Sequence, residues 1–242
     1  MHLVIDIGSK QVEAGLFDAE RLVHSGIVDD PTRMTEFLKG KQITSGLIAS
    51  KDPNKSRELM VLLTTHGIPC RLLETKEFDR LTTPETRSML EPSRVANIYG
   101  ALVHFSGNDC IVVDLGSKVR FDSISKTGVY LGGALFPDFE SVFSCLEHTK
   151  FSDLGGQTPS TLGKNSLDQA KSGCYFGLLG AIERIVSELR LSFDAPSSVM
   201  TLATGVLSHS ISIQNDLSEF IDRVDPHLTL IGLNQILNEA KL

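Results

Sequence analysis

Two copies of one short phrase carry residue types that could bind phosphate. "VIDIGSK" spans Val4 to Lys10, and "VVDLGSK" spans Val112 to Lys118. In each copy an Asp precedes a Gly-Ser tip. Glycine lets the backbone approach an anion, and turn N–H groups with the Ser hydroxyl can donate to phosphate oxygens. The Asp carboxylate could hold a cation that bridges those oxygens. The candidate phosphate-loop residues are Asp6, Gly8, Ser9 and Lys10 in the first copy and Asp114, Gly116, Ser117 and Lys118 in the second.

The repetition is what favours a function for this phrase. A single D-x-G-S is a common turn, and an exposed Lys at its tip is usually just solvated. Each copy, however, predicts a meander of three strands in which apolar and polar residues alternate. The expected strands are Leu3–Ile5, Val12 to Leu16 and Arg21–Ser25 in the first half, and Ile111–Val113, Val119 to Asp122 and Val129–Gly132 in the second.

Helices and strands are expected to alternate after each meander. The predicted helices are Thr32–Leu38, Lys55–His66, Leu167–Leu191 and a last one beginning at Asp225-Pro226, and the predicted strands are Gly46–Ser50, Cys70–Glu74 and Val199–Thr204. This pattern predicts an α/β protein of two related domains, 1–107 and 108–242. The two hairpins are expected to face each other across a cleft and to hold a polyphosphate from both sides, as phosphoryl transfer requires.

Composition narrows the class of partner. The 242-residue chain has 41% hydrophobic and 22% charged residues and a net charge of −7 without a block of like charges. Nucleic acids and anionic membranes attract clustered Lys and Arg, so neither is expected as the main partner. We expect a cytoplasmic protein, because the start lacks a signal-peptide pattern and no apolar stretch reaches the ~20 residues of a membrane span. The four widely spaced cysteines are expected to be reduced, without a structural zinc site.

Four stretches, mostly in the second half, resemble type III pantothenate kinase, a family of the sugar kinase, heat-shock ATPase and actin superfamily. They are "VVDLGSKVRFDSISKTGVYLGGALFP" (112–137), "LGKNSLDQAKSGCYFGLLGAIERIV" (162–186), "LATGVL" (202–207) and "VDPHLTLIGL" (224–233). They occur in the family's order and spacing, and the resemblance extends more loosely over the first half.

The resemblance implies an actin-like (ribonuclease H-like) fold of duplicated βββαβα domains that works as a homodimer. It implies transfer of the γ-phosphate of ATP to pantothenate in coenzyme A biosynthesis, with Mg²⁺ and a monovalent cation, K⁺ or NH₄⁺. By position, it implies metal contacts at Asp6 and Asp114, an ATP contact at Ser117, adenosine contacts at Ala203, Thr204 and Gly205, and an acceptor contact at Ser166.

The chain departs from this family in the acceptor motif. The family's Gly-Ala-Asp-Arg aligns with "EPSR", Glu91-Pro92-Ser93-Arg94, so Ser93 stands where the family has the Asp proposed to take the hydroxyl proton. Serine needs a base of its own at neutral pH, and a well-placed base contributes about 10²–10⁴-fold to the rate. With Asp6, Ser93 and Arg94 as the principal catalytic residues, reduced activity is as reasonable an expectation as none.

Ser166 also has a structural interpretation. The pattern S-x-x-Q from Ser166 to Gln169 predicts a capping box at the start of the long helix. Capping is compatible with a ligand contact, because helix N-termini favour anions.

Three functions stay open from the residues alone. The first is a type III-like pantothenate kinase with slow turnover. The second is a catalytically inactive relative that binds ligands or regulates a partner. The third is a kinase for another small anionic acceptor, which Arg94 would suit.

Overall fold

The computed structural model describes residues 1–9, 11–74 and 79–239. It has two five-stranded sheets, and the chain divides into two compact units. Unit 1 comprises Met1–Gly107, Gly128–Tyr130 and His227–Leu242, and unit 2 comprises Asn108–Thr127 and Leu131–Pro226. The sequence-based division kept 108–242 together, whereas the contacts of the folded chain place its last helix in unit 1.

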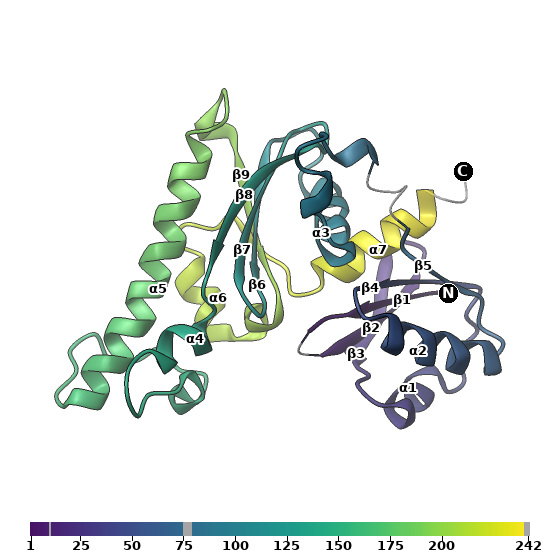
Figure 1. Cartoon of the computed structure of the whole chain (residues 1–242), viewed down its shortest axis with the longest axis horizontal. Coiled ribbons are helices and arrows are strands. Elements are labelled where there is room, and N and C mark those ends of the chain that lie inside the picture. Colours follow the sequence, from purple (N-terminus) through teal and green to yellow (C-terminus); the bar gives the residue numbers. More distant parts are fainter. Residues whose placement is uncertain (10, 75–78, 240–242) are drawn as a thin grey trace. The chain divides into compact units, whose positions relative to one another are not determined.

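The sheet of unit 1 is mixed, with the strand order β3-β2-β1-β4-β5 (Figure 1). β1 is antiparallel to β2 and parallel to β4, and β4 is parallel to β5. The strands are β1 (His2–Ile7), β2 (Val12–Asp18), β3 (Arg21–Ile27), β4 (Ser45–Ser50) and β5 (Cys70–Leu72).

Helices cover both faces of this first sheet (Figure 1). α1 (Pro31–Leu38) and α2 (Pro53–Thr65) lie on one face, and each begins with a capping Asp followed by a Pro at the first helical position. α7 (Leu228–Glu239) lies on the other face, with α3 (Pro92–His104) packed against it. A Cβ on Gly232 of α7 would lie 1.7 Å from the Ala96 carbonyl oxygen of α3, so glycine permits this close helix contact.

The sheet of unit 2 repeats the topology of the first. Its order is β10-β9-β6-β7-β8. Read from β8, this is again the third, second, first, fourth and fifth strand of the half. β6 is antiparallel to β7 and parallel to β9. The strands are β6 (Cys110–Leu115), β7 (Val119–Ile124), β8 (Tyr130–Phe136), β9 (Met200–Thr204) and β10 (Arg223–Val224). The predicted duplication of an α/β architecture is confirmed.

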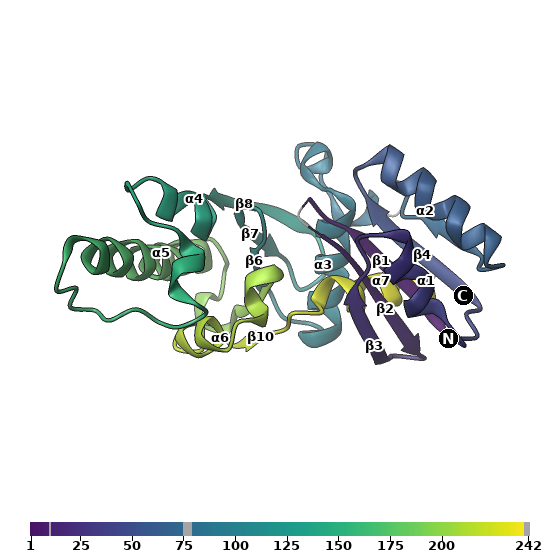
Figure 2. The same cartoon turned by 90° about the horizontal axis from the view of Figure 1, so that it is seen from below.

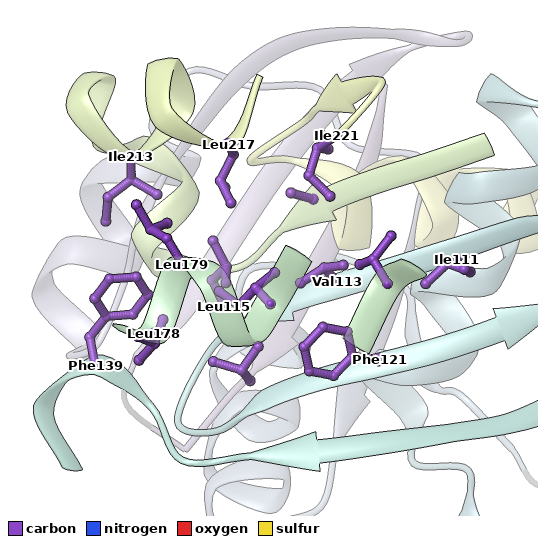
Figure 3. Packing of buried hydrophobic residues seen from close by; sticks show 14 of the residues in the cluster. Ile111, Val113, Leu115, Phe121, Phe139, Leu178, Leu179, Ile213, Leu217 and Ile221 are labelled. Carbon is purple, nitrogen blue, oxygen red and sulfur yellow. The ribbon is translucent and has the colours of Figure 1, made fainter. Parts of the chain in front are cut away.

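The core of unit 2 lies between its sheet and three helices. These are α4 (Phe139–Ser144), α5 (Ser166–Arg190) and α6 (Ile211–Leu217). Figure 2 shows α4 beside the long α5, and Figure 3 shows Leu115 of β6 close to Leu179 of α5. Cys174, Leu178 and Ile182 are buried at a spacing of four residues, so they form an apolar stripe along α5.

The predicted helices and strands differ from the structure at the last helix and in four further elements. The last helix begins at Leu228, so the prediction of a start at Asp225-Pro226 was wrong. The Asp225 N–H donates to the Ala203 carbonyl oxygen at 2.9 Å and so extends the pairing of β10 with β9. The sequence analysis also did not predict α3, α4, α6 or β10. No described helix has the length and hydrophobicity needed to cross a lipid bilayer.

Candidate functional site

The first hairpin turn follows β1 directly. Asp6 lies within β1 and is half-buried, while Ser9 at the turn is exposed. The Gly8 N–H donates to the Gln11 carbonyl oxygen at 3.0 Å and closes the turn. Lys10, which the sequence analysis placed at the tip, lies outside the described residues. The Asp and the turn therefore have the strand-then-turn arrangement that the sequence predicted.

Helix α3 brings the acceptor motif to the end of β1. The helix begins after Glu91, with Pro92 as its first residue. In its first turn, the Ser93 hydroxyl donates to Asp6 Oδ1 at 2.6 Å. Two residues that lie 87 positions apart in the chain are thus in direct contact. Ser93, where the resemblance implied a replaced Asp, is therefore hydrogen-bonded to a carboxylate of the predicted first phosphate loop.

Arg94, the next residue of α3, is held by three contacts within unit 1. Its Nη2 donates to the Tyr130 hydroxyl at 2.6 Å, and its Nη1 donates to the Met89 carbonyl oxygen. The guanidinium carbon also lies 5.0 Å from the centroid of the Tyr130 ring. Arg94 is half-buried, so a planar, charged donor group is fixed next to Ser93.

Lys51 is a charged residue of this region that the sequence analysis missed. It follows β4 and forms an ion pair with Glu91, the residue before α3. Because β4 is parallel to β1, with Ile7 opposite Ser50, the carboxyl ends of both strands meet at one edge of the sheet. A charged residue directly after a buried parallel strand is a signal that could have identified Lys51.

The second hairpin places Asp114 against the backbone of a glycine. Asp114 lies in β6, and Ser117 and Lys118 form the turn that follows. A Cβ on Gly205 would lie 2.5 Å from Asp114 Oδ1, and Gly205 has a φ of 95°, which L side chains rarely adopt. A Cβ on Gly116 would lie 3.1 Å from the same oxygen. Unit 2 therefore brings together the second phosphate loop and the predicted adenosine motif.

Thr204 adds an oxygen ligand to this second region. It is opposite Asp114 in the parallel pairing of β6 with β9. Its Oγ1 is buried and has no hydrogen-bond partner among the described residues. A carboxylate and an unsatisfied hydroxyl are the oxygen ligands that hard cations prefer, so this donor set fits a cation. By contrast, the Ala203 side chain lies in the hydrophobic core and its carbonyl oxygen accepts from the Asp225 N–H, so its adenosine contact stays a prediction.

The expected capping box at the start of α5 was wrong by one residue. Asn165 is the N-cap: its Oδ1 accepts from the Asp168 N–H at 2.9 Å, and its Nδ2 donates to Asp168 Oδ2 at 2.8 Å. Ser166 is the first residue of the helix and is exposed. Its predicted role at the acceptor stays a prediction.

Comparison with protein families gives a match over most of the chain. The model of the family "type III pantothenate kinase" matches residues 2–188. A type III pantothenate kinase of Frankia casuarinae is 30% identical over 256 residues, which cover 99% of this chain and 99% of that protein. One of Parafrankia sp. is 29% identical, with 99% of this chain and 98% of that protein covered.

Solved structures show the same fold at low sequence identity. A ROK family glucokinase from Streptomyces griseus, in complex with glucose and AMPPNP, has a TM-score of 0.55 and 12% identity over 97% of this chain and 98% of that chain. The ethanolamine utilization protein EutJ from Carboxydothermus hydrogenoformans has a TM-score of 0.57 and 14% identity over 96% of this chain and 88% of that chain. Both likenesses support the actin-like fold.

Proposed function

The chain belongs to the type III pantothenate kinase family, and on that basis we propose that it phosphorylates pantothenate with ATP. One observation supports retained activity more than any other: the hydrogen bond from Ser93 to Asp6. It links the position that lacks the family's carboxylate to a carboxylate from another part of the chain.

The acceptor is proposed to bind at the carboxyl edge of the first sheet. There the Arg94 guanidinium would bind the carboxylate of the acceptor, since its planar fork suits such groups. The acceptor hydroxyl would lie beside Ser93. Its oxygen forms the new bond to the γ-phosphorus, the bond from that phosphorus to the bridging oxygen breaks, and ADP leaves. The Ser93–Asp6 hydrogen bond offers the hydroxyl proton a path to a carboxylate oxygen.

This arrangement predicts slow turnover. A carboxylate placed directly at the reacting hydroxyl raises the rate by about 10²–10⁴-fold. A base reached only through the Ser93 hydroxyl is less effective. Phosphoryl transfer through a loose transition state tolerates a weak base, because positioning and charge neutralisation carry most of the catalysis. Activity is therefore expected to be reduced but measurable.

The nucleotide is proposed to bind at the second hairpin. The Asp114 carboxylate and the buried Thr204 hydroxyl would hold a monovalent cation, K⁺ or NH₄⁺, beside Gly205. Mg²⁺ bound with ATP would neutralise charge on the phosphates. The predicted metal contacts are Asp6 within unit 1 and Asp114 within unit 2. We also propose a homodimer, which light scattering of the purified protein would test.

The experiment that tests this function is a coupled ADP-release assay with pantothenate, ATP and Mg²⁺, run with and without K⁺. We expect slow turnover that needs K⁺ and falls at least tenfold in Asp114→Asn, because a ligand of the proposed cation is lost. Arg94→Lys should raise KM for pantothenate more than it lowers kcat. Turnover that is unaffected by Asp114→Asn would contradict the proposal.

The alternative is a catalytically inactive relative that binds the same ligands, and the absence of a carboxylate at position 93 favours it. Calorimetry with ATP and pantothenate separates the two. Binding of both ligands without ADP release would support the alternative. Turnover of another small hydroxy acid, without turnover of pantothenate, would instead indicate a different acceptor.

A further inference from the structure

The side chain of Tyr130 has a feature that the proposed reaction does not yet use. It is only 1% exposed, yet its hydroxyl accepts a hydrogen bond from Arg94 and its ring faces the same guanidinium. A buried tyrosine hydroxyl normally needs a partner, and here the partner is the group proposed to bind the acceptor. Tyr130 is also the last residue of the short segment that unit 1 takes from this part of the chain.

We propose that Tyr130 is a positioning residue that holds the Arg94 guanidinium in the orientation needed for the acceptor's carboxylate. This inference rests on the proposed function for the identity of the ligand. An arginine side chain that is free to rotate loses rotamer entropy when a ligand fixes it. Two hydrogen bonds and the ring contact fix Arg94 beforehand, so less of that entropy is lost on binding.

The fixed geometry also affects selectivity. The Tyr130 hydroxyl and the Met89 carbonyl oxygen each accept a hydrogen bond from one terminal amino group of Arg94. These two bonds fix the orientation of the guanidinium plane. A fork in one plane favours a planar carboxylate over a flexible or uncharged group. Loss of one of these contacts should therefore weaken acceptor binding more than it slows the chemical step.

The chain offers a matched control in Arg80 and Tyr99. The Arg80 guanidinium carbon lies 4.9 Å from the Tyr99 ring centroid, and Tyr99 is 4% exposed. Arg80 also pairs with Glu239 at 2.5 Å. This pair has the same chemistry, but Tyr99 lies near the middle of α3, whereas Arg94 of the other pair lies in the first turn. Tyr99→Phe therefore measures what the loss of a buried tyrosine hydroxyl does away from the proposed acceptor.

The experiment compares Tyr130→Phe with Tyr99→Phe in the full chain. For Tyr130→Phe we expect the KM for pantothenate to rise roughly 3- to 10-fold, as for one hydrogen bond, with kcat and the KM for ATP within about twofold of wild type. Tyr99→Phe should leave all three unchanged. In an Arg94→Lys background, Tyr130→Phe should add little. Equal effects of the two Tyr→Phe variants, or full additivity with Arg94→Lys, would overturn the inference.

A second measurement distinguishes failure of this inference from failure of the proposed function. Nitrogen-15 NMR of the Arg94 guanidinium should show slow rotation in the wild type and in Tyr99→Phe, and faster rotation in Tyr130→Phe. If the wild type does not bind pantothenate but this difference is present, the positioning role is supported and the proposed acceptor is wrong. If the rotation rate is the same in all three proteins, the positioning role is overturned.

Discussion

The two hairpins share one strand topology but differ in the element that meets each Asp. In unit 1, the carboxylate of Asp6 accepts a hydrogen bond from Ser93 in the first turn of a helix. In unit 2, the carboxylate of Asp114 lies against the backbone of Gly205 and opposite the buried Thr204. The Asp before the turn thus contacts the start of a helix in unit 1 and the backbone of a glycine in unit 2.

The difference shows how a duplicated fold can separate two tasks. The edge of the first sheet has charged side chains next to Asp6, namely Arg94 and the Lys51–Glu91 pair, which suit an anionic acceptor. The second region offers a carboxylate and a buried hydroxyl, which suit a cation. The two regions therefore differ through the segment that packs against each Asp, α3 in unit 1 and the Thr204–Gly205 segment in unit 2, and not through the repeated turn.

The largest expected effect is from Gly205→Ala in unit 2. The φ of 95° costs a non-glycine residue about 1–3 kcal/mol, and the new Cβ would collide with Asp114 Oδ1. We expect a lower free energy of unfolding and at least about tenfold weaker ATP binding, measured by urea denaturation and calorimetry. Gly180→Ala in α5, where a Cβ meets nothing within 4 Å, is the control and should stabilise by about 0.5–1 kcal/mol. Wild-type stability and affinity in Gly205→Ala would contradict this account.

Ser93→Asp tests the corresponding contact in unit 1. The substitution replaces a hydrogen bond of 2.6 Å with two carboxylates, which repel unless a proton or a cation lies between them. Without Mg²⁺ we expect the free energy of unfolding to fall by about 1 kcal/mol or more, and Mg²⁺ to restore it. In the control Ser93→Asn the new side chain has the shape of Asp but no charge. Its free energy of unfolding should not change with Mg²⁺. Thermal melts of both variants with and without Mg²⁺ check this, and identical responses would refute it.

Buried thiols give a pH dependence that compares the two sheets. Burial raises the pKa of Cys110 in β6 from 9.0 to about 12, and that of Cys70 in β5 from 9.0 to about 11. Below pH 9 the thiols are protonated in both the folded and the unfolded chain, so they do not make the free energy of unfolding depend on pH. Above pH 9 the unfolded chain loses them first, so each thiol lowers stability by about 1.4 kcal/mol per pH unit. The loss ends near pH 11 for Cys70 and near pH 12 for Cys110.

Urea denaturation between pH 8 and pH 11 would measure this slope. Cys110→Ala and Cys70→Ala should each make it shallower, whereas Cys145→Ala, at an exposed position, is the control. If neither buried-thiol variant changes the slope, the thiols do not cause the pH dependence.

The smallest expected effect concerns Lys51 and Glu91. Their side chains are 57% and 28% exposed, so a double-mutant cycle of Lys51→Met and Glu91→Gln should give a coupling of about 0.2–1 kcal/mol, weakened by salt. The exposed pair Arg184–Glu188 on α5 provides a comparison, with an expected coupling of about 0.3–0.5 kcal/mol. A zero coupling at Lys51–Glu91 would mean that this pair does not stabilise the start of α3.

Local sequence patterns predicted both hairpins and most of the described helices and strands. Alternation of apolar residues and turn composition are local properties, so Asp6 and Asp114 could be placed at strand ends before turns without knowledge of the fold. The repeated phrase also predicted the duplicated topology. The start of α5 was wrong by one residue because Asn165 and Ser166 are both good caps, and the local pattern does not choose between them.

Tertiary structure decided which residues meet. Helix α3, which carries Ser93 and Arg94, was not predicted, and the contacts of these residues with Asp6 and Tyr130 join segments 87 and 36 positions apart. The last helix likewise packs on α3 in unit 1 and not with the half that precedes it in the chain. Such contacts depend on how helices pack against a sheet, and that packing is set by burial summed over many residues. This packing cannot be read from any single stretch of the sequence.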